Sequence, residues 1–207
     1  MAAVAIPAAS VIVLREAPLE VLMLRRGATA SFVPNAWVFP GGAVDEDDER
    51  GSTLETMRVT AARELFEETG LWLGTPPANA ATKRRALLAG ELTFASLLAE
   101  APAELERLVW TSHWITPTPV PKRFDTYFFV TEVPRDAQAS LEGDECANLR
   151  WLAPEAALAE LDMVFPTIKN LEAMRGFSSA AEWIDSRRGA VIEAIQPIIV
   201  DKKIVLP

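Results

Sequence analysis

The chain has 207 residues, of which 29 are acidic and 20 are basic, so its formal net charge at pH 7 is −9. Half of the residues are apolar and 24% are charged, a composition that is typical of globular proteins and excludes general disorder. The acidic balance argues against a surface built for nucleic acid or anionic lipid, because both would be repelled. We therefore expect neither nucleic acid nor a membrane as a partner.

The length and the cysteine content limit the number of domains and the compartments that we expect. A chain of this size buries roughly 70% of its unfolded surface, and we expect a single domain over residues 1–207. The single cysteine, Cys146, cannot form an intramolecular disulfide, so nothing points to an oxidising compartment. The apolar stretch 2–14 has no basic residues before it and is interrupted by Pro7, which favours a strand over a signal peptide. These features predict a cytoplasmic protein.

The N-terminal part of the chain predicts a β-hairpin. The runs 10–15 and 20–24 are rich in β-branched and apolar residues, and only four residues separate them. The segment 37–42, with the sequence WVFPGG, predicts a short strand that ends in two glycines. A loop with acidic residues at 45–49 follows.

Residues 53–68 predict a helix, because they are strong helix formers without Gly or Pro. Ser52 precedes the helix and Glu55 stands three residues later, as in a capping box, and Gly70 is a C-terminal stop. The apolar face that we expect to pack on a sheet consists of Val59, Ala62, Leu65 and Phe66.

The second half of the chain alternates helical and extended segments. Residues 81–107 predict a helical insertion, and 166–193 predict a C-terminal helical extension followed by an extended tail. Strand-like runs occupy 109–116, 124–132 and 148–152, and a helix with proline in its first turn is predicted at 154–161. This order predicts an α/β fold in which a mixed sheet carries helices on both faces.

Three glutamates gather near the end of the helix predicted at 53–68. Residues three and four apart are neighbours on a helix, so Glu64, Glu67 and Glu68 project from one face. Each like-charge pair costs a helix roughly 0.2–0.5 kcal/mol. One interpretation is a solvated acidic face that Arg63 partly relieves. The other is a site for a hard cation, because Mg²⁺ and Mn²⁺ prefer carboxylate oxygens.

The residues around this cluster resemble the signature of the Nudix hydrolases, which is a glycine, a glutamate and then Arg-Glu-hydrophobic-x-Glu-Glu-x-Gly-hydrophobic. From Glu55 to Leu71 the spacing fits that signature throughout. The family usually places five residues between the glycine and the first glutamate, whereas twelve separate Gly42 from Glu55 here. We expect this insertion to lengthen the loop without moving the carboxylates. The resemblance implies a Nudix-type α/β/α sandwich with a mixed β-sheet and added helices.

The resemblance also implies roles for the residues at the end of the helix. Glu64, Glu67 and Glu68 would bind Mg²⁺ or Mn²⁺ that bridges a diphosphate, and Gly42 would add a backbone carbonyl. The metal would lower the pKa of a water that attacks phosphorus. Arg63 would orient Glu67 by a charge-assisted hydrogen bond, and the alternative is a plain surface ion pair.

The general base is implied less directly, because members of the family use either a glutamate of the signature or one in a later loop. Glu64 and Glu55 are the candidates within the signature. Glu142, Asp144 and Glu145 lie in such a later loop, and Glu145 is our candidate there. The alternative for all three is a solvated loop.

Further segments resemble one branch of the family, the branch that contains the animal peroxisomal coenzyme A diphosphatase. They include 112–117 and 121–129. The resemblance implies that coenzyme A or acyl-CoA is cleaved to 3′,5′-ADP and a phosphopantetheine product. Arg123 is the candidate for contact with substrate phosphate, because arginine suits bidentate contact, and Gly41 and Gly42 would lie beside the substrate. A solvated arginine is the alternative.

Two other functions stay open. One is hydrolysis of the same bond in ADP-ribose or a dinucleotide, and the other is a non-catalytic Nudix domain that senses a nucleotide. The intact set of three carboxylates disfavours the sensor. The expected partner is a small-molecule nucleoside diphosphate derivative, and the sequence leaves open whether the protein forms a homodimer.

Overall fold

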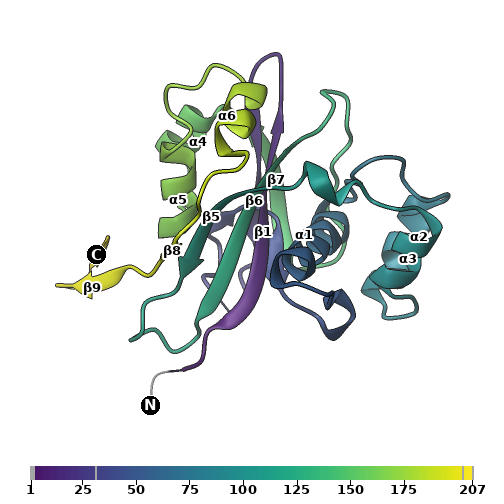
Figure 1. Cartoon of the computed structure of the whole chain (residues 1–207), viewed down its shortest axis with the longest axis horizontal. Coiled ribbons are helices and arrows are strands. Elements are labelled where there is room, and N and C mark those ends of the chain that lie inside the picture. Colours follow the sequence, from purple (N-terminus) through teal and green to yellow (C-terminus); the bar gives the residue numbers. More distant parts are fainter. Residues whose placement is uncertain (1–2, 31, 202, 207) are drawn as a thin grey trace.

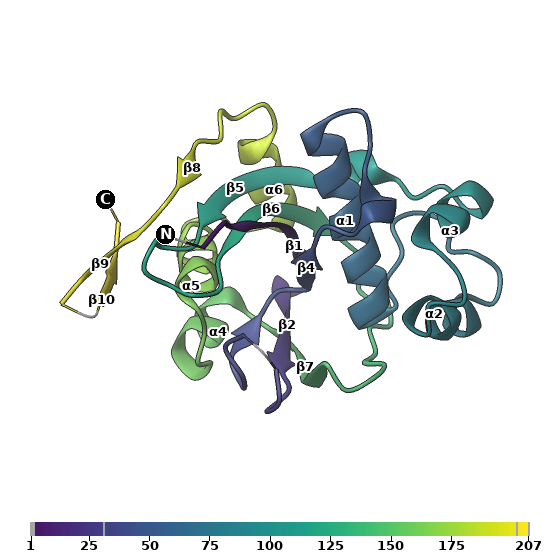
Figure 2. The same ribbon diagram turned by 90° about the horizontal axis from the view of Figure 1, so that it is seen from below.

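The computed structural model of the chain describes residues 3–30, 32–201 and 203–206. Its strands are β1 (Ile6–Arg15), β2 (Glu20–Arg26), β3 (Trp37–Val38), β4 (Gly41–Ala43), β5 (Val109–Ile115), β6 (Phe124–Glu132), β7 (Cys146–Leu152), β8 (Ala194–Ile195), β9 (Ile198–Val200) and β10 (Lys203–Val205). The strands β1 to β8 form one mixed sheet in the order β3-β2-β1-β6-β5-β8, in which β4 also pairs with β1 and β7 pairs with β2. The strands β9 and β10 pair only with each other in the described chain and lie beyond β8, at the C-terminal end (Figures 1 and 2).

The helices are α1 (Thr53–Thr69), α2 (Ala80–Leu88), α3 (Phe94–Glu100), α4 (Pro154–Glu160), α5 (Phe165–Glu172) and α6 (Ala180–Arg187), with short 3-10 turns η1 (Glu46–Asp48) and η2 (Leu105–Arg107). Figure 1 shows α1, α2 and α3 on one side of the sheet and α4, α5 and α6 on the other. The predicted α/β fold with helices on both faces is therefore confirmed. None of the described helices is long and apolar enough to cross a membrane.

The central strand β1 contributes to two cores, one on each face of the sheet. Val11 and Val13 pack with Leu65 of α1 in one core, whereas Ile12 and Leu14 belong to the core under α4, α5 and α6. A strand that is covered on both faces needs apolar side chains on both, which explains the continuous run Val-Ile-Val-Leu.

Two strands share one edge of β1, and this arrangement positions the glycines of β4. Strand β1 runs parallel to β6, but along its other edge it pairs antiparallel with β4 at Ala8–Ser10 and with β2 at Leu14 and Arg15. The strand β4 therefore occupies one end of β1, beside α1 (Figure 2). Its Gly41 and Gly42 face the end of that helix.

Helix α1 begins and ends at the predicted caps. The Ser52 Oγ accepts a hydrogen bond from the Glu55 N–H at 3.3 Å, and Gly70 adopts a left-handed φ of 73° while its N–H donates to the Phe66 carbonyl. Both caps are local to the helix, so its bounds differ from the prediction by one residue. The predicted apolar face is buried.

The two predicted helical additions are shorter than expected. The segment 81–107 contains α2 and α3, which are separated by a turn in which Gly90 has a φ of 70°. The segment 166–193 is helical only in α5 and α6, and residues 188–193 are not helical. Gly189 has a φ of 70° just beyond α6, a conformation that ends a helix.

Candidate active site

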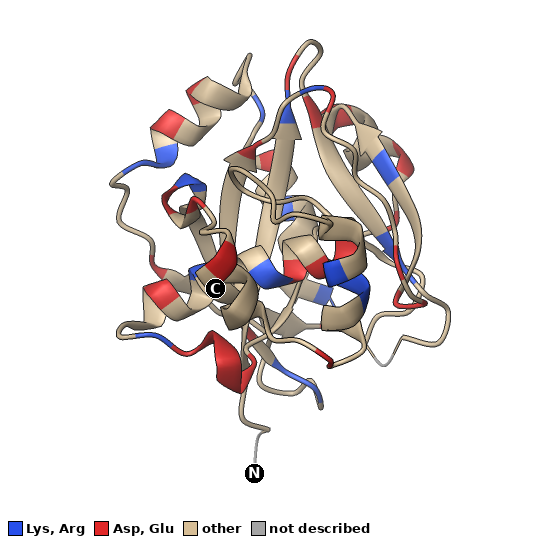
Figure 3. Ribbon diagram, turned by 90° about the vertical axis from the view of Figure 1, so that its right-hand side faces the viewer, with Lys and Arg blue, Asp and Glu red and all other residues tan. Residues whose placement is uncertain are grey.

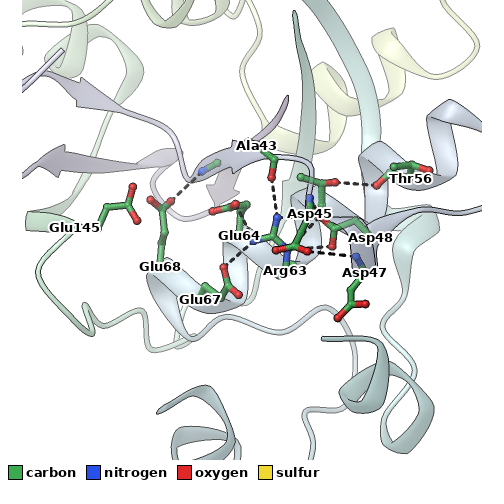
Figure 4. Close-up of polar contacts among 12 residues, drawn as sticks. Ala43, Asp45, Asp47, Asp48, Thr56, Arg63, Glu64, Glu67, Glu68 and Glu145 are labelled. Carbon is green, nitrogen blue, oxygen red and sulfur yellow. Dashed lines mark hydrogen bonds and ion pairs between the residues drawn. The ribbon is translucent and has the colours of Figure 1, made fainter. Parts of the chain in front are cut away.

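The signature glutamates, Glu64, Glu67 and Glu68, lie in the last two turns of α1, where the helix meets β4 (Figure 4). Glu68 is 7% exposed, and its Oε2 accepts a hydrogen bond from the Gly41 N–H at 2.9 Å. Gly42 lies against the carboxylate of Glu64, so closely that a Cβ atom there would be 2.4 Å from Oε1. The two glycines thus allow β4 to approach the carboxylates directly.

Arg63 is the positively charged residue at the centre of the cluster, and it is only 8% exposed. Its Nη1 donates to Glu64 Oε1 and to Glu67 Oε2, both at 2.8 Å. Its Nε and Nη2 donate to the Asp48 carboxylate, and Nη2 also donates to the Ala43 carbonyl at 2.8 Å. The predicted hydrogen bond from Arg63 to Glu67 is present, and its burial distinguishes it from a plain surface ion pair.

Burial raises the pKa of all three signature glutamates. Loss of hydration raises the pKa of Glu64 to about 7, although the neighbouring Arg63 opposes this change. Burial likewise raises the pKa of Glu67, and burial together with repulsion from Glu64 raises the pKa of Glu68 well above its usual range. The cluster is therefore short of positive charge, and a bound cation would relieve that shortage.

The chemistry of this donor set fits a hard divalent cation, because it consists of three carboxylates with raised pKa, of which only Glu64 and Glu67 are paired with Arg63. In the part of the chain that the structure describes, however, no three His, Cys, Asp or Glu side chains are grouped so as to hold a metal ion. Glu64 and Glu67 are both hydrogen-bonded to one nitrogen of Arg63, and Glu68 is bonded to Gly41. The metal-binding roles of these residues and of Gly42 thus stay predictions.

A cavity of about 530 Å³ adjoins the same glycines, Gly41 and Gly42, which form part of its wall. Its volume lies in the range of small-molecule sites. The aromatic residues that line it are Phe32, Phe39, Trp114, Phe124, Phe128 and Phe165. Arg26 and Glu145 also line the cavity, and their side chains form an ion pair at 3.4 Å. The cavity thus joins a charged end beside the glutamates to an apolar interior.

Glu145 immediately precedes β7, and its side chain is 64% exposed. Figure 4 shows its carboxylate near Glu68, and its charge contributes to the raised pKa of both Glu64 and Glu68. The next residue, Cys146, is buried, and its thiol donates to Glu68 Oε1 at 3.7 Å. The structure therefore brings the candidate base to the cluster, and its catalytic role remains a prediction.

Glu55, the first glutamate of the signature, lies away from this cluster. It stands in the first turn of α1, where its carboxylate accepts a hydrogen bond from the Ser52 hydroxyl at 2.7 Å. It lies nine positions before Glu64, roughly 13 Å along the helix axis. The expected catalytic role of Glu55 is corrected to a structural one at the start of the helix.

Arg123 is the second predicted residue that the structure places elsewhere. Its Nε donates to the Thr116 carbonyl at 2.9 Å and its Nη1 donates to the Ala3 carbonyl at 2.8 Å. The residue is 9% exposed and is not part of the cavity wall. The expected contact of Arg123 with substrate phosphate is corrected to a role in holding these backbone segments together.

Two residues that contact the cluster, Asp48 and Cys146, are not predicted from the sequence. Asp48 stands in the acidic run 45–49, and no local pattern separates it from its neighbours. Cys146 carries no sequence signal beyond its position next to Glu145.

Comparison with known proteins agrees with this arrangement. The chain matches the NUDIX domain over residues 5–172. It is 32% identical over 159 residues to the Caenorhabditis elegans protein named "Putative nudix hydrolase 7", across 74% of this chain and 53% of that protein. It is 27% identical over 154 residues to the human m7GpppN-mRNA hydrolase NUDT17, across 72% of this chain and 38% of that protein.

A third relative is the acyl-coenzyme A diphosphatase NUDT19 of Xenopus laevis, which is 22% identical over 206 residues and matches 68% of this chain and 54% of that protein. The chain spans about half, or less, of the length of these curated relatives.

Two solved structures share the fold. The NUDIX hydrolase from Alicyclobacillus acidocaldarius superposes with a TM-score of 0.79 at 26% identity, over 88% of this chain and 96% of that chain. The NUDIX domain of Shewanella oneidensis NrtR, solved with ADP ribose, gives a TM-score of 0.54 at 14% identity, over 82% and 86% of the two chains. The signature residues, the fold and the match over most of its length show that this chain belongs to the Nudix hydrolase superfamily.

Proposed function

We propose that the protein hydrolyses the diphosphate bond of nucleoside diphosphate derivatives with the help of a divalent cation. The observation that carries this proposal is the grouping of Glu64, Glu67 and Glu68 at the end of α1. Glu64 and Glu68 contact Gly42 and Gly41 of β4, and these two glycines also line a cavity large enough for a small ligand. A diphosphate would be repelled by this group alone, so a cation is needed to bring the two together.

The residues that would hold Mg²⁺ or Mn²⁺ are Glu64, Glu67 and Glu68, together with the carbonyl of Gly42. When bound, such a cation neutralises charge on the diphosphate and lowers the pKa of the attacking water. Arg63 keeps Glu64 and Glu67 oriented through two hydrogen bonds from one nitrogen. Each of the three signature glutamates and Arg63 thus has a role in the proposed reaction.

Glu145 would act as the general base. Its exposed carboxylate lies at the cavity wall near Glu68, where it can accept a proton from water. In the reaction, the water oxygen forms a new bond to phosphorus, the bond from phosphorus to the bridging oxygen breaks, and Glu145 takes the proton. Two phosphate monoesters result.

Coenzyme A or acyl-CoA is the favoured substrate within this class. Support comes from the resemblance of segments 112–117 and 121–129 to the coenzyme A diphosphatase branch, and from similarity to a protein named acyl-coenzyme A diphosphatase. ADP-ribose and dinucleotides are the alternatives, and the relative named as an mRNA cap hydrolase adds capped dinucleotides. The net charge of −9 disfavours a long RNA.

Incubation of the purified protein with Mg²⁺ and a substrate panel tests the proposal. The panel contains coenzyme A, acyl-CoA, ADP-ribose, a dinucleoside polyphosphate and a cap analogue, and products are identified by mass spectrometry. We expect the highest kcat/KM for coenzyme A or acyl-CoA, with 3′,5′-ADP as a product. A preference for ADP-ribose would contradict the substrate but not the reaction. Nucleotide binding without turnover would favour a sensor.

A further inference from the structure

Asp48 is the buried acidic residue of the loop before α1. Asp45, Glu46, Asp47 and Glu49 are all exposed, whereas Asp48 is completely buried. In Figure 3 the turn η1, which contains Asp48, is red along its whole length, so burial and not composition sets this residue apart. A carboxylate gives up its hydration in this way only where a charged partner replaces water.

The charged partner of Asp48 is Arg63. The Arg63 Nε donates to Asp48 Oδ1 at 3.0 Å and Nη2 donates to Oδ2 at 2.8 Å, which makes a bidentate pair. The Asp45 N–H donates to Asp48 Oδ2 at 3.0 Å, so the backbone of the loop fixes the carboxylate in turn. One edge of the guanidinium is thereby held in place.

The remaining nitrogen, Nη1, serves the proposed metal ligands. It donates to Glu64 and to Glu67 at 2.8 Å each. Because the guanidinium is rigid and planar, fixing one edge also fixes where the other edge points. Arg63 therefore links Asp48 to Glu64 and Glu67 through hydrogen bonds, and Figure 4 shows these four residues together.

We propose that Asp48 is a positioning residue that orients Arg63 and keeps Glu64 and Glu67 able to bind a divalent cation, an inference that rests on the proposed function. Asp48 belongs to the segment inserted between Gly42 and Glu55. The insertion is thus part of the site and is more than the spacer that the sequence led us to expect.

Binding of Mn²⁺ without substrate, followed by electron paramagnetic resonance, tests this role independently of turnover. We expect Asp48→Asn to weaken Mn²⁺ binding by about 10- to 100-fold, as is typical when a residue that supports metal ligands is lost, and to lower kcat. Asp47→Asn makes the same chemical change on the exposed neighbour and should bind Mn²⁺ like wild type. Asp48→Glu, which keeps the charge, should lie closer to wild type than Asp48→Asn.

An Asp48→Asn variant that melts at a lower temperature but binds Mn²⁺ with wild-type affinity would overturn the proposal, because Asp48 would then be only structural. If that variant does not fold, Asp48→Ser also removes the charge while keeping an acceptor, and it is judged by the same criterion.

The outcomes also separate this proposal from the proposed function. Mn²⁺ affinity that depends on Asp48, without turnover of any diphosphate, would refute the function alone. Turnover and Mn²⁺ binding that both tolerate loss of the Asp48 charge would refute the positioning role alone. A wild-type protein that does not bind Mn²⁺ would refute both.

Discussion

A methyl group on the α-carbon of Gly42 would stand 2.4 Å from Oε1 of Glu64, so the glycine and the carboxylate are in direct contact. The same hypothetical atom would be 2.6 Å from Cδ and 2.8 Å from Oε2. The conflict is thus with the carboxylate itself, which must move if a side chain is added. The pairing of β4 with β1 at Ala9 and Gly42 holds the glycine in place.

The substitution Gly42→Ala should therefore remove activity by displacing Glu64. A misplacement of about 1 Å in a catalytic group costs on the order of 100-fold in rate, and we expect a fall in kcat of that size. Gly51→Ala is the matched control, because a Cβ atom there would meet only Glu55 Oε2 at an ordinary 3.7 Å. Steady-state kinetics of both variants check the prediction, and wild-type kcat in Gly42→Ala would contradict it.

The substitution Glu68→Gln should weaken metal binding without lowering the stability of the metal-free protein. Burial disfavours the charged form of Glu68, and the glutamine carbonyl can still accept from the Gly41 N–H. In chelator we expect the variant to be as stable as wild type or more stable, by up to about 1 kcal/mol, which corresponds to roughly 2–4 °C in Tm. Added Mg²⁺ should raise the Tm of wild type more than that of the variant. Paired thermal melts decide, and a variant that melts below wild type in chelator would contradict this account.

The stability of the metal-free protein should fall as the pH rises from about 4.5 to about 7. Burial raises the pKa of Glu64 to about 7 from an ordinary value of 4.5, so the folded state binds this proton more tightly than the unfolded state. The stabilisation is fully present below the unfolded pKa and is lost as the pH rises through the folded pKa, a change on the order of 3 kcal/mol. The raised pKa values of Glu67 and Glu68 act in the same direction.

Urea unfolding in chelator at several pH values across that window measures this dependence. Glu64→Gln should make the dependence less steep, because the variant has no proton to lose at that position, while Glu67 and Glu68 still contribute. The same slope in variant and wild type would show that Glu64 does not titrate in this way.

The substitution Glu145→Gln should lower kcat/KM by about 10²- to 10⁴-fold, the range that a general base contributes. Asp144→Asn is the control, because this neighbour is exposed in the same loop. If both variants lose equally little activity, the base is another residue.

The parts of the fold that the sequence predicts are those with local signals. Helix α1 lies between its caps Ser52 and Gly70, as predicted, because each cap is made within a few residues of the helix end. The hairpin of β1 and β2 follows from two apolar runs with a short connection. The grouping of Glu64, Glu67 and Glu68 follows from helical periodicity alone.

The parts of the site that the sequence does not predict depend on contacts between distant segments. Asp48 is buried only because its loop folds back onto Arg63, and its exposed neighbours have the same chemistry. Arg123 has the residue type expected for a phosphate contact, but the Ala3 carbonyl, 120 residues away in sequence, accepts its hydrogen bond. Glu55 fits the signature spacing, yet its partner is the capping residue Ser52.

The central claim is that Glu64, Glu67 and Glu68 hold a divalent cation that enables diphosphate hydrolysis, and the rate of hydrolysis across a Mg²⁺ titration tests it most directly. Wild type and Glu68→Gln are compared with coenzyme A as substrate, starting from protein treated with chelator. Glutamine is a poorer ligand for a hard cation than glutamate. The account predicts no turnover by wild type in chelator, a rate that rises with Mg²⁺, and a strongly reduced rate for the variant throughout. Turnover by wild type in chelator, or an undiminished rate in Glu68→Gln, would contradict it.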